Sequence, residues 1–191
     1  MALTKIITPI LLMALLAGCA SAPPKYYSLD MRPHNTTAPG TAIQVDHITI
    51  ADILASQNIF IQKSPTQIEY YAVDQWAANL SDLLQEKLSV ELGEPTNTGD
   101  TLLLTGTLQA FGQKDTAWHK DTVTAASAIV KLHIQLRAPD ASRNSPPLLD
   151  KTYTCEHPAT EPGAPAIVEA LSRCVESIAT ELRNDARQLQ G

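Results

Sequence analysis

The sequence predicts an α+β fold, a two-layer sandwich in which two amphipathic helices cover one face of a mostly antiparallel sheet. Two observations carry this prediction. Apolar residues recur with helical spacing at 75–92 and again beyond Pro165, whereas several other segments alternate apolar and polar residues as half-buried strands do. The expected order is strands, one helix, two long strands, a further strand and a final helix.

Short strands are expected before the first helix. The tyrosine pair at 26–27 is typical of a short first strand. Segment 43–50 is rich in β-branched residues, and its apolar residues change from one face to the other, so we expect a bulge or bend near His47. Segments 59–61 and 68–71 indicate a hairpin.

The first helix is expected over 75–92. Asp74 is placed to cap its N-terminus, and Gly93 to end it. One face carries an apolar stripe, which consists of Trp76, Leu80, Leu83, Leu84, Leu88 and Leu92.

Two clear strands follow, at 102–110 and 130–137. Their alternation predicts a sheet with one buried and one wet face, the wet one carrying Thr105, Thr107, Gln109, Lys131, His133, Gln135 and Arg137. A further strand is expected at 148–155. In the final helix, Cys174 falls on the apolar stripe and therefore faces the sheet, where Cys155 would lie.

The first 18 residues combine one positive charge, a short apolar run and small residues at its end, the pattern of a secretory signal peptide. The quartet Leu16-Ala17-Gly18-Cys19 is similar to the lipobox of bacterial lipoproteins, in which the cysteine is acylated. We expect cleavage before Cys19 and permanent anchoring through several acyl chains. The alternative is an ordinary signal or an uncleaved anchor in which Cys19 is only a small apolar residue.

This gives three parts: a signal peptide at 1–18, a lipidated Cys19 with a flexible tether at 19–41, and a periplasmic domain at 42–191. The tether is assigned because it is rich in Pro, Ser, Thr and Asn. By resemblance to lipoprotein sorting in enterobacteria, Ala20 in place of Asp after the cysteine predicts transfer to the outer membrane.

Cys155 and Cys174 remain besides the anchor. Because export leads to an oxidising compartment, we expect them to form a disulfide. The competing interpretation is a metal site formed with His157, but three candidates with irregular spacing are a weak zinc signal.

Charge and motifs exclude several functions. The net charge is −6, and about −7 once Lys5 leaves with the signal, without basic clusters, so nucleic acid is not an expected partner. Nucleophile elbow, phosphate-binding glycine loop and metalloprotease motif are all missing from the sequence. His119 with Asp121 could form a base and its orienting partner, but this spacing in a turn is common by chance. We therefore expect no enzyme, no catalytic residues, no metal and no cofactor.

Apolar residues also stand where turn residues are expected. They are either core or a contact for a partner or lipid. These residues are Ile53, Leu54, Ile59, Phe60, Tyr70, Tyr71 and Trp76.

Several segments form an ordered pattern: Tyr26-Tyr27-Ser28-Leu29 after the anchor, the strand 43–50 running into Ala51-Asp52-Ile53-Leu54, Ile68-Glu69-Tyr70-Tyr71, and Trp76-Ala77. With Leu104-Thr105-Gly106-Thr107-Leu108-Gln109-Ala110-Phe111 and the amphipathic final helix, it extends along nearly the whole mature chain. This pattern resembles the ABC-type transport auxiliary lipoproteins, the family of paraquat-inducible protein C. Gln75-Trp76-Ala77-Ala78-Asn79-Leu80 departs from the family's usual Arg-Trp-Ala-Glu-Pro-Leu.

The resemblance implies an outer-membrane lipoprotein that serves as accessory subunit of an MCE-type ABC system, which moves phospholipid between the two membranes and supports outer-membrane integrity. Its partner would be a periplasmic MCE-domain protein, and it could form a homo-oligomer matching that partner's symmetry. The alternative is a structural lipoprotein that assists lipopolysaccharide or pilus assembly. A small envelope hydrolase is a more distant rival.

Overall fold

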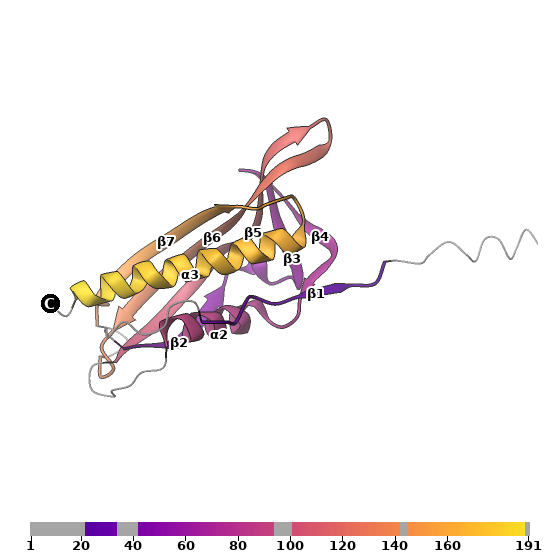
Figure 1. Cartoon of the computed structure of the whole chain (residues 1–191). Helices are drawn as coiled ribbons and strands as arrows, with labels where there is room; N and C mark the ends of the chain where they lie inside the picture. Colours follow the sequence, from indigo (N-terminus) through magenta and orange to yellow (C-terminus); the bar gives the residue numbers. More distant parts are fainter. Residues whose placement is uncertain (1–21, 34–41, 94–100, 142–144, 190–191) are drawn as a thin grey trace, which may run out of the picture.

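The computed structural model describes residues 22–33, 42–93, 101–141 and 145–189. It has two layers, a sheet and two helices that pack side by side on one of its faces (Figure 1). The predicted α+β sandwich is thus confirmed. The strands are β1 Lys25–Tyr27, β2 Ile43–Ile50, β3 Asn58–Ser64, β4 Gln67–Trp76, β5 Leu102–His119, β6 Thr122–Arg137 and β7 Leu149–Pro158; the helices are α2 Leu80–Leu92 and α3 Ala164–Gln188, with a 3-10 turn, η1, at Asp52–Leu54.

The sheet is organised around β5. One edge of β5 pairs in parallel first with β2 and then with β3, and its other edge pairs antiparallel with β6. The order across the sheet is β1-β4-β3-β5-β6-β7, with β2 beside β5. The long pairings β5–β6 and β6–β7 and the β3–β4 hairpin are antiparallel, as the alternation predicts.

Bulges adjust which residues face the helices. The predicted irregularity in β2 lies between Val45 and His47, so Ile43 and Ile48 are both buried. A second bulge follows Leu108, after which Ala110 pairs with Lys131 on the wet face. The expectation that Ala110 continues the buried face is therefore wrong, because an extra residue reverses the alternation.

The first helix begins later than its pattern predicts. Trp76 ends β4, and α2 starts at Leu80 with the Asn79 side chain accepting a hydrogen bond from the backbone N–H of Ser81 at 3.0 Å. Asp74 is not the cap, since its carboxylate accepts a hydrogen bond of 2.8 Å from the Tyr27 hydroxyl. The other end is as predicted, at Gly93 with a φ of 79°.

The predicted tether is too long, because part of 19–41 belongs to the domain. β1 pairs with β4, and Leu29 is buried in the core. The backbone N–H of Asp30 donates to the Ser172 hydroxyl on α3 at 3.0 Å. These contacts fix the chain from Lys25 to Asp30, which leaves five residues between Cys19 and β1. Cys19 itself lies outside the described residues.

Helix α3 packs its apolar stripe on β5, β6 and β7. Its buried side chains include Ile167, Leu171, Val175, Ile178 and Leu182. A disulfide joins Cys174 of this stripe to Cys155 on β7, with Cα atoms 5.5 Å apart and a sequence separation of 19. Both sulfurs are therefore occupied, and neither is a thiolate that could bind metal with His157. Neither helix of the described part is long and apolar enough to span a membrane.

A buried ion pair joins the two helices. The Lys87 ammonium on α2 lies 2.7 Å from the Glu91 carboxylate and 3.0 Å from that of Glu176 on α3, and its side chain is fully buried. Arg183 donates to the Glu91 carbonyl at 2.7 Å. Paired charges of this kind fix the register of α2 against α3, and removing one partner would leave a buried charge uncompensated.

A polar cluster fixes the C-terminal part of α3 to β7. The Asp185 carboxylate accepts hydrogen bonds of 2.7 Å from both the Lys151 ammonium and the Tyr153 hydroxyl. Burial alone would raise the pKa of Asp185, but these two hydrogen bonds and the Lys151 charge outweigh it, so its pKa is lowered.

We expect the disulfide to stabilise the domain by about 3 kcal/mol, because it closes a loop of 19 residues in the unfolded chain. Replacing Cys155 and Cys174 together with alanine should lower Tm by roughly 6–12 °C in a thermal melt. Mass spectrometry after alkylation of the non-reduced protein is the direct check. Two alkylated cysteines in the 155–174 segment would contradict the pairing.

The lowered pKa of Asp185 makes the domain sensitive to acid. A carboxylate whose pKa is depressed by folding contributes stability above its unfolded pKa of about 4, and that stability is lost as the pH falls through the folded pKa. Asp185→Asn should cost about 1–2 kcal/mol at pH 7, from lost charge-assisted hydrogen bonds, and progressively less on acidification. Urea unfolding between about pH 7 and pH 3 gives the free energy of unfolding of the wild type and of Asp185→Asn. If the two proteins lose stability in parallel as the pH falls, the assignment is contradicted.

Candidate interaction surface

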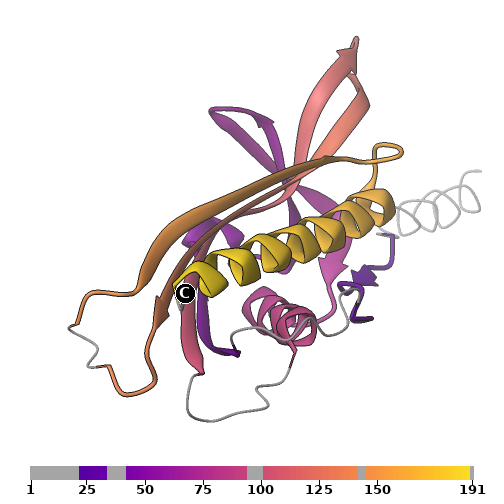
Figure 2. The same ribbon diagram turned by 60° about the vertical axis from the view of Figure 1, so that its left-hand side comes forward.

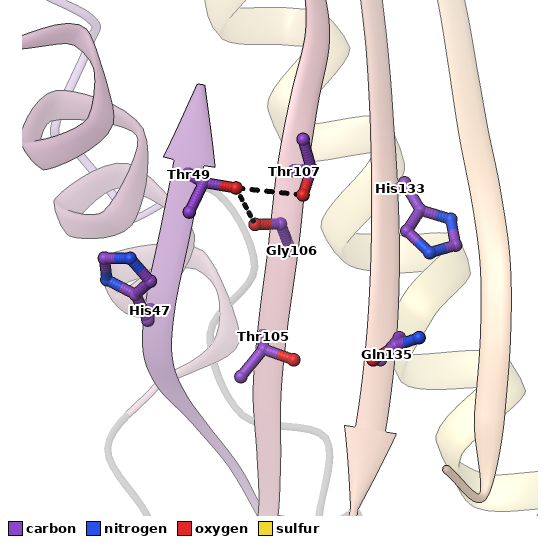
Figure 3. A pocket seen from close by; sticks show the side chains of 7 residues that line it. All are labelled: His47, Thr49, Thr105, Gly106, Thr107, His133 and Gln135. Carbon is purple, nitrogen blue, oxygen red and sulfur yellow. Dashed lines mark hydrogen bonds between the residues drawn. The ribbon is translucent and has the colours of Figure 1, made fainter. Parts of the chain in front are cut away.

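The face of the sheet turned away from the helices is open and polar. We call it the polar face and define it by Thr49 on β2, Thr105 and Thr107 on β5, and His133 and Gln135 on β6 (Figure 3). The alternation predicted this wet face, and the registers bring its rows side by side: Thr49 pairs with Thr107, and Thr107 with His133.

Hydrogen bonds cross this face from strand to strand. The Thr49 hydroxyl donates to the Gly106 carbonyl at 3.1 Å and lies 2.9 Å from the Thr107 hydroxyl (Figure 3). The rings and amides on β6 turn toward β7, where the His133 Nε2 and Gln135 Nε2 atoms lie 3.3 and 2.8 Å from Asp150 oxygens. The side chains are thus held in place while remaining accessible.

Two shallow hollows mark the polar face. One, of about 280 Å³, is lined by His47, Thr49, Thr105, Gly106, Thr107, His133 and Gln135. The second, of about 750 Å³, adjoins it toward the C-terminal end of β6, where Asp46 and Arg137 add opposite charges. Hydroxyls, amides and imidazoles suit this surface to hydrogen bonding with a partner. Across the ranges described, no group of three or more His, Cys, Asp or Glu side chains is arranged to hold a metal.

Farther along the same side lies an apolar corner, defined as Ile53, Phe60 and Tyr70. Phe60 on β3 pairs with Gly112 on β5 and with Tyr70 on β4. The side chains of Phe60 and Tyr70 therefore lie on the same side of the sheet, the one turned away from the helices. The rings of Phe60 and Tyr70 meet edge to face, 6.2 Å between centroids, and the Tyr70 hydroxyl donates to the Ile53 carbonyl at 2.6 Å. Ile53 and Tyr70 are 39% and 38% exposed.

The structure divides the seven apolar residues that the sequence suggested as a contact. Leu54, Ile59, Phe60 and Trp76 are buried, which agrees with the alternative that these apolar residues belong to the core. The reason is that β4 runs on through Trp76, whose ring packs 5.5 Å from Phe111 inside the core. Ile53 and Tyr70 are the two that are exposed.

Tyr71, the seventh residue, is half-buried and takes part in an internal network. Its hydroxyl donates to the Gln113 amide oxygen, and the Gln113 amide donates to the Asp115 carboxylate at 2.5 Å. Burial, with the nearby charges of Asp74 and Asp115, raises the pKa of the Tyr71 phenol. Tyr71 therefore braces β4 against β5 and is not a free contact residue.

The sequence reasoning missed Trp118. It ended the strand at 110, whereas β5 continues to His119 and carries Trp118 out on a hairpin, where it is 42% exposed. Threonines and alanines around it give a weak apolar alternation, so only the isolated tryptophan signalled an exposed aromatic residue. His119 and Asp121 lie at the tip of this hairpin, both exposed.

The sequence is similar to one protein family, and the fold is similar to that of solved structures. The family described as ABC-type transport auxiliary lipoprotein component matches residues 27–111. A crystal structure of a DUF330 protein from Xanthomonas campestris has a TM-score of 0.67 at 16% identity, over 87% of this chain and 96% of that one. A crystal structure of an uncharacterized protein has a TM-score of 0.61 at 15% identity, over 86% and 99%. Among curated proteins none matches the sequence significantly.

The sequence match relates residues 27–111 to an auxiliary transport lipoprotein, and the solved structures share the α+β fold. Over residues 27–111 the chain is similar to the ABC-type transport auxiliary lipoprotein family, the family that its sequence pattern resembles. The description of that family as a lipoprotein component implies anchoring in the cell envelope.

The division between core and surface can be tested by stability measurements. Trp76→Ala should lower the free energy of unfolding by about 3–5 kcal/mol, since it empties a fully enclosed site. Ile53→Ala should change it by less than about 1 kcal/mol, because that side chain is substantially exposed. Urea titration monitored by circular dichroism gives both values. Equal costs would mean that one of the two assignments is wrong.

Proposed function

We propose that this lipoprotein is an accessory subunit of an MCE-type ABC transport system that moves phospholipid between inner and outer membranes. The match of residues 27–111 to the auxiliary lipoprotein family is the observation that carries the proposal. The subunit acts by binding a periplasmic MCE-domain partner, and through it supports outer-membrane integrity. No residue of the polar face or the apolar corner is assigned a chemical step.

The partner binds at the apolar corner and the adjoining polar face. An exposed isoleucine and tyrosine over a buried phenylalanine provide an apolar anchor, which is the kind of site that dominates binding energy at protein interfaces. The hydroxyls and amides of the polar face provide the surrounding hydrogen bonds. Because most of these side chains are already fixed by cross-strand bonds, little side-chain entropy is lost on binding.

The anchor is Cys19, and the membrane is the outer one. Ala20 after the cysteine, where Asp would favour retention at the inner membrane, supports this location. An outer-membrane subunit would receive or dock the periplasmic partner at the far end of its path.

Co-purification tests the proposal. Full-length lipidated protein, extracted in detergent from native membranes, should bring with it an MCE-domain protein or a permease or ATPase subunit. Ile53→Asp should reduce that recovery about tenfold or more, because a carboxylate buried in an apolar contact costs at least 1.4 kcal/mol. The matched control is Leu148→Asp, which changes a residue of similar type that is 53% exposed at the opposite end of the sheet.

Recovery of no transport subunit would overturn the proposal. Recovery of lipopolysaccharide or pilus assembly proteins in their place would favour the rival role in envelope assembly. Equal recovery with Ile53→Asp and Leu148→Asp would keep the transport role but remove the apolar corner as the docking site.

A further inference from the structure

Two hairpins project beyond the helix layer at one end of the molecule (Figures 1 and 2). One joins β3 to β4 and the other joins β5 to β6. They point the same way because β3 runs parallel to β5, with Phe60 beside Gly112. Beyond this contact the two tips separate and stand clear of α3 (Figure 2).

The N-terminal chain leaves the domain toward the same end. β1 pairs in parallel with β4, with Lys25 beside Asp74. Since β4 begins at the hairpin turn and runs away from it, the start of β1 faces that turn. The residues before Lys25 therefore enter from the side on which the hairpins project.

The length of the chain between Cys19 and Lys25 allows the anchor to reach nearly the level of the tips. Six residue steps separate Cys19 from Lys25, and an extended chain spans at most about 3.5 Å per residue, so Cys19 lies within about 21 Å of Lys25. The strand pairings from β1 through β4 and β3 to β5 place Lys25 at the same height along the sheet as Phe111. Trp118 lies seven residues farther along β5, which is about 23 Å nearer the tip. A membrane that holds Cys19 in line with the strands therefore meets the tips.

The side chains at the tips suit the boundary between lipid headgroups and acyl chains. Trp118 is 42% exposed, and the Lys63 ammonium of the neighbouring hairpin lies 5.1 Å from its ring centroid. On the neighbouring hairpin Ile68, near the start of β4, is also exposed. Tryptophan and lysine together are typical of membrane interfaces, where the ring is apolar at one edge and hydrogen-bonds at the other.

Charge at the tips is balanced. Lys63 lies 2.8 Å from the Glu69 carboxylate, and Lys114 lies 2.7 Å from that of Glu156. The contact therefore does not depend on anionic lipid. It depends on the aromatic and aliphatic side chains, with the acyl anchor holding them at the surface.

We propose that the two hairpin tips rest in the interfacial layer of the membrane that holds the lipid anchor, with Trp118 inserted among the headgroups. The inference rests on the anchoring at Cys19 that is part of the proposed function. It stands the sheet upright on the membrane, so the polar face and the apolar corner remain open from the side.

The two tryptophans of the chain make the inference measurable. Trp76 is 2% exposed inside the core and serves as an internal reference. The lipidated mature protein, purified in detergent, is reconstituted into vesicles of phosphatidylethanolamine with some phosphatidylglycerol, brominated near the headgroup end of the acyl chains. We expect roughly a twofold or greater loss of Trp118 emission, and Trp118→Phe should remove the quenching.

A second single reporter marks the opposite end. Leu148→Trp in the Trp118→Phe protein places a tryptophan roughly 40 Å from the tips, since Val123 pairs with Trp118 and Leu136 pairs with the start of β7. This reporter should not be quenched. Thermal melts confirm that both variants are folded.

Each outcome decides something. Quenching that persists unchanged in Trp118→Phe, or quenching of the Leu148→Trp reporter as strong as that of Trp118, would overturn the proposed orientation. Flotation with the vesicles but no quenching would overturn the inference and leave the anchoring intact. Failure to float would overturn the anchoring at Cys19, and the inference with it.

Discussion

The close approach of β3 to β5 is the contact on which the arrangement of the sheet depends. At Gly112 a Cβ atom would lie 2.2 Å from the Phe60 carbonyl oxygen, so only glycine lets β3 pair at this point. β4 in turn pairs with β3, and β1 pairs with β4, so both are connected to β5 through β3. One strand, β5, thereby connects the N-terminal segment and both hairpins to the part of the sheet covered by α3. A side chain at 112 would separate the two halves of the sheet.

The two sides of the sheet have separate tasks. The helix side holds the apolar core, and the disulfide and the Lys151–Asp185 pair fix α3 to β7. The other side is polar, and its hydrogen bonds run between neighbouring strands and do not close a cavity. Stability therefore resides mainly on the helix side, so the exposed side chains of the polar face can change with little effect on folding. This separation suits a protein that recognises partners with a rigid surface.

Periodicity in the sequence predicted what depends on local pattern: the alternating strands, the long amphipathic α3 and the wet face that carries His133. It could not place Trp76, because an apolar residue just before a helix fits the stripe of that helix as well as the end of a strand. In β4, four residues lie between Tyr70 and Gln75, whereas only Ile59 lies between their partners on β3. This irregular pairing interrupts the alternation of apolar and polar residues by which a strand is predicted. Nor could composition show that Leu29 packs in the core, since that depends on α3, more than a hundred residues away. The sequence pointed to the residues of the apolar corner but could not separate the exposed from the buried ones. Exposure of Ile53 and burial of Leu54 depend on strands that are distant in the sequence.

The parallel pairing of β1 with β4 also determines how the domain bears mechanical load. A pull on the N-terminus, directed along the strand, acts on the β1–β4 hydrogen bonds all at once and does not open them one by one from an end. Behind them, the bond between the Asp30 backbone and Ser172 joins the same segment to α3. Tension applied at the N-terminus is thus shared between the sheet and the helix layer.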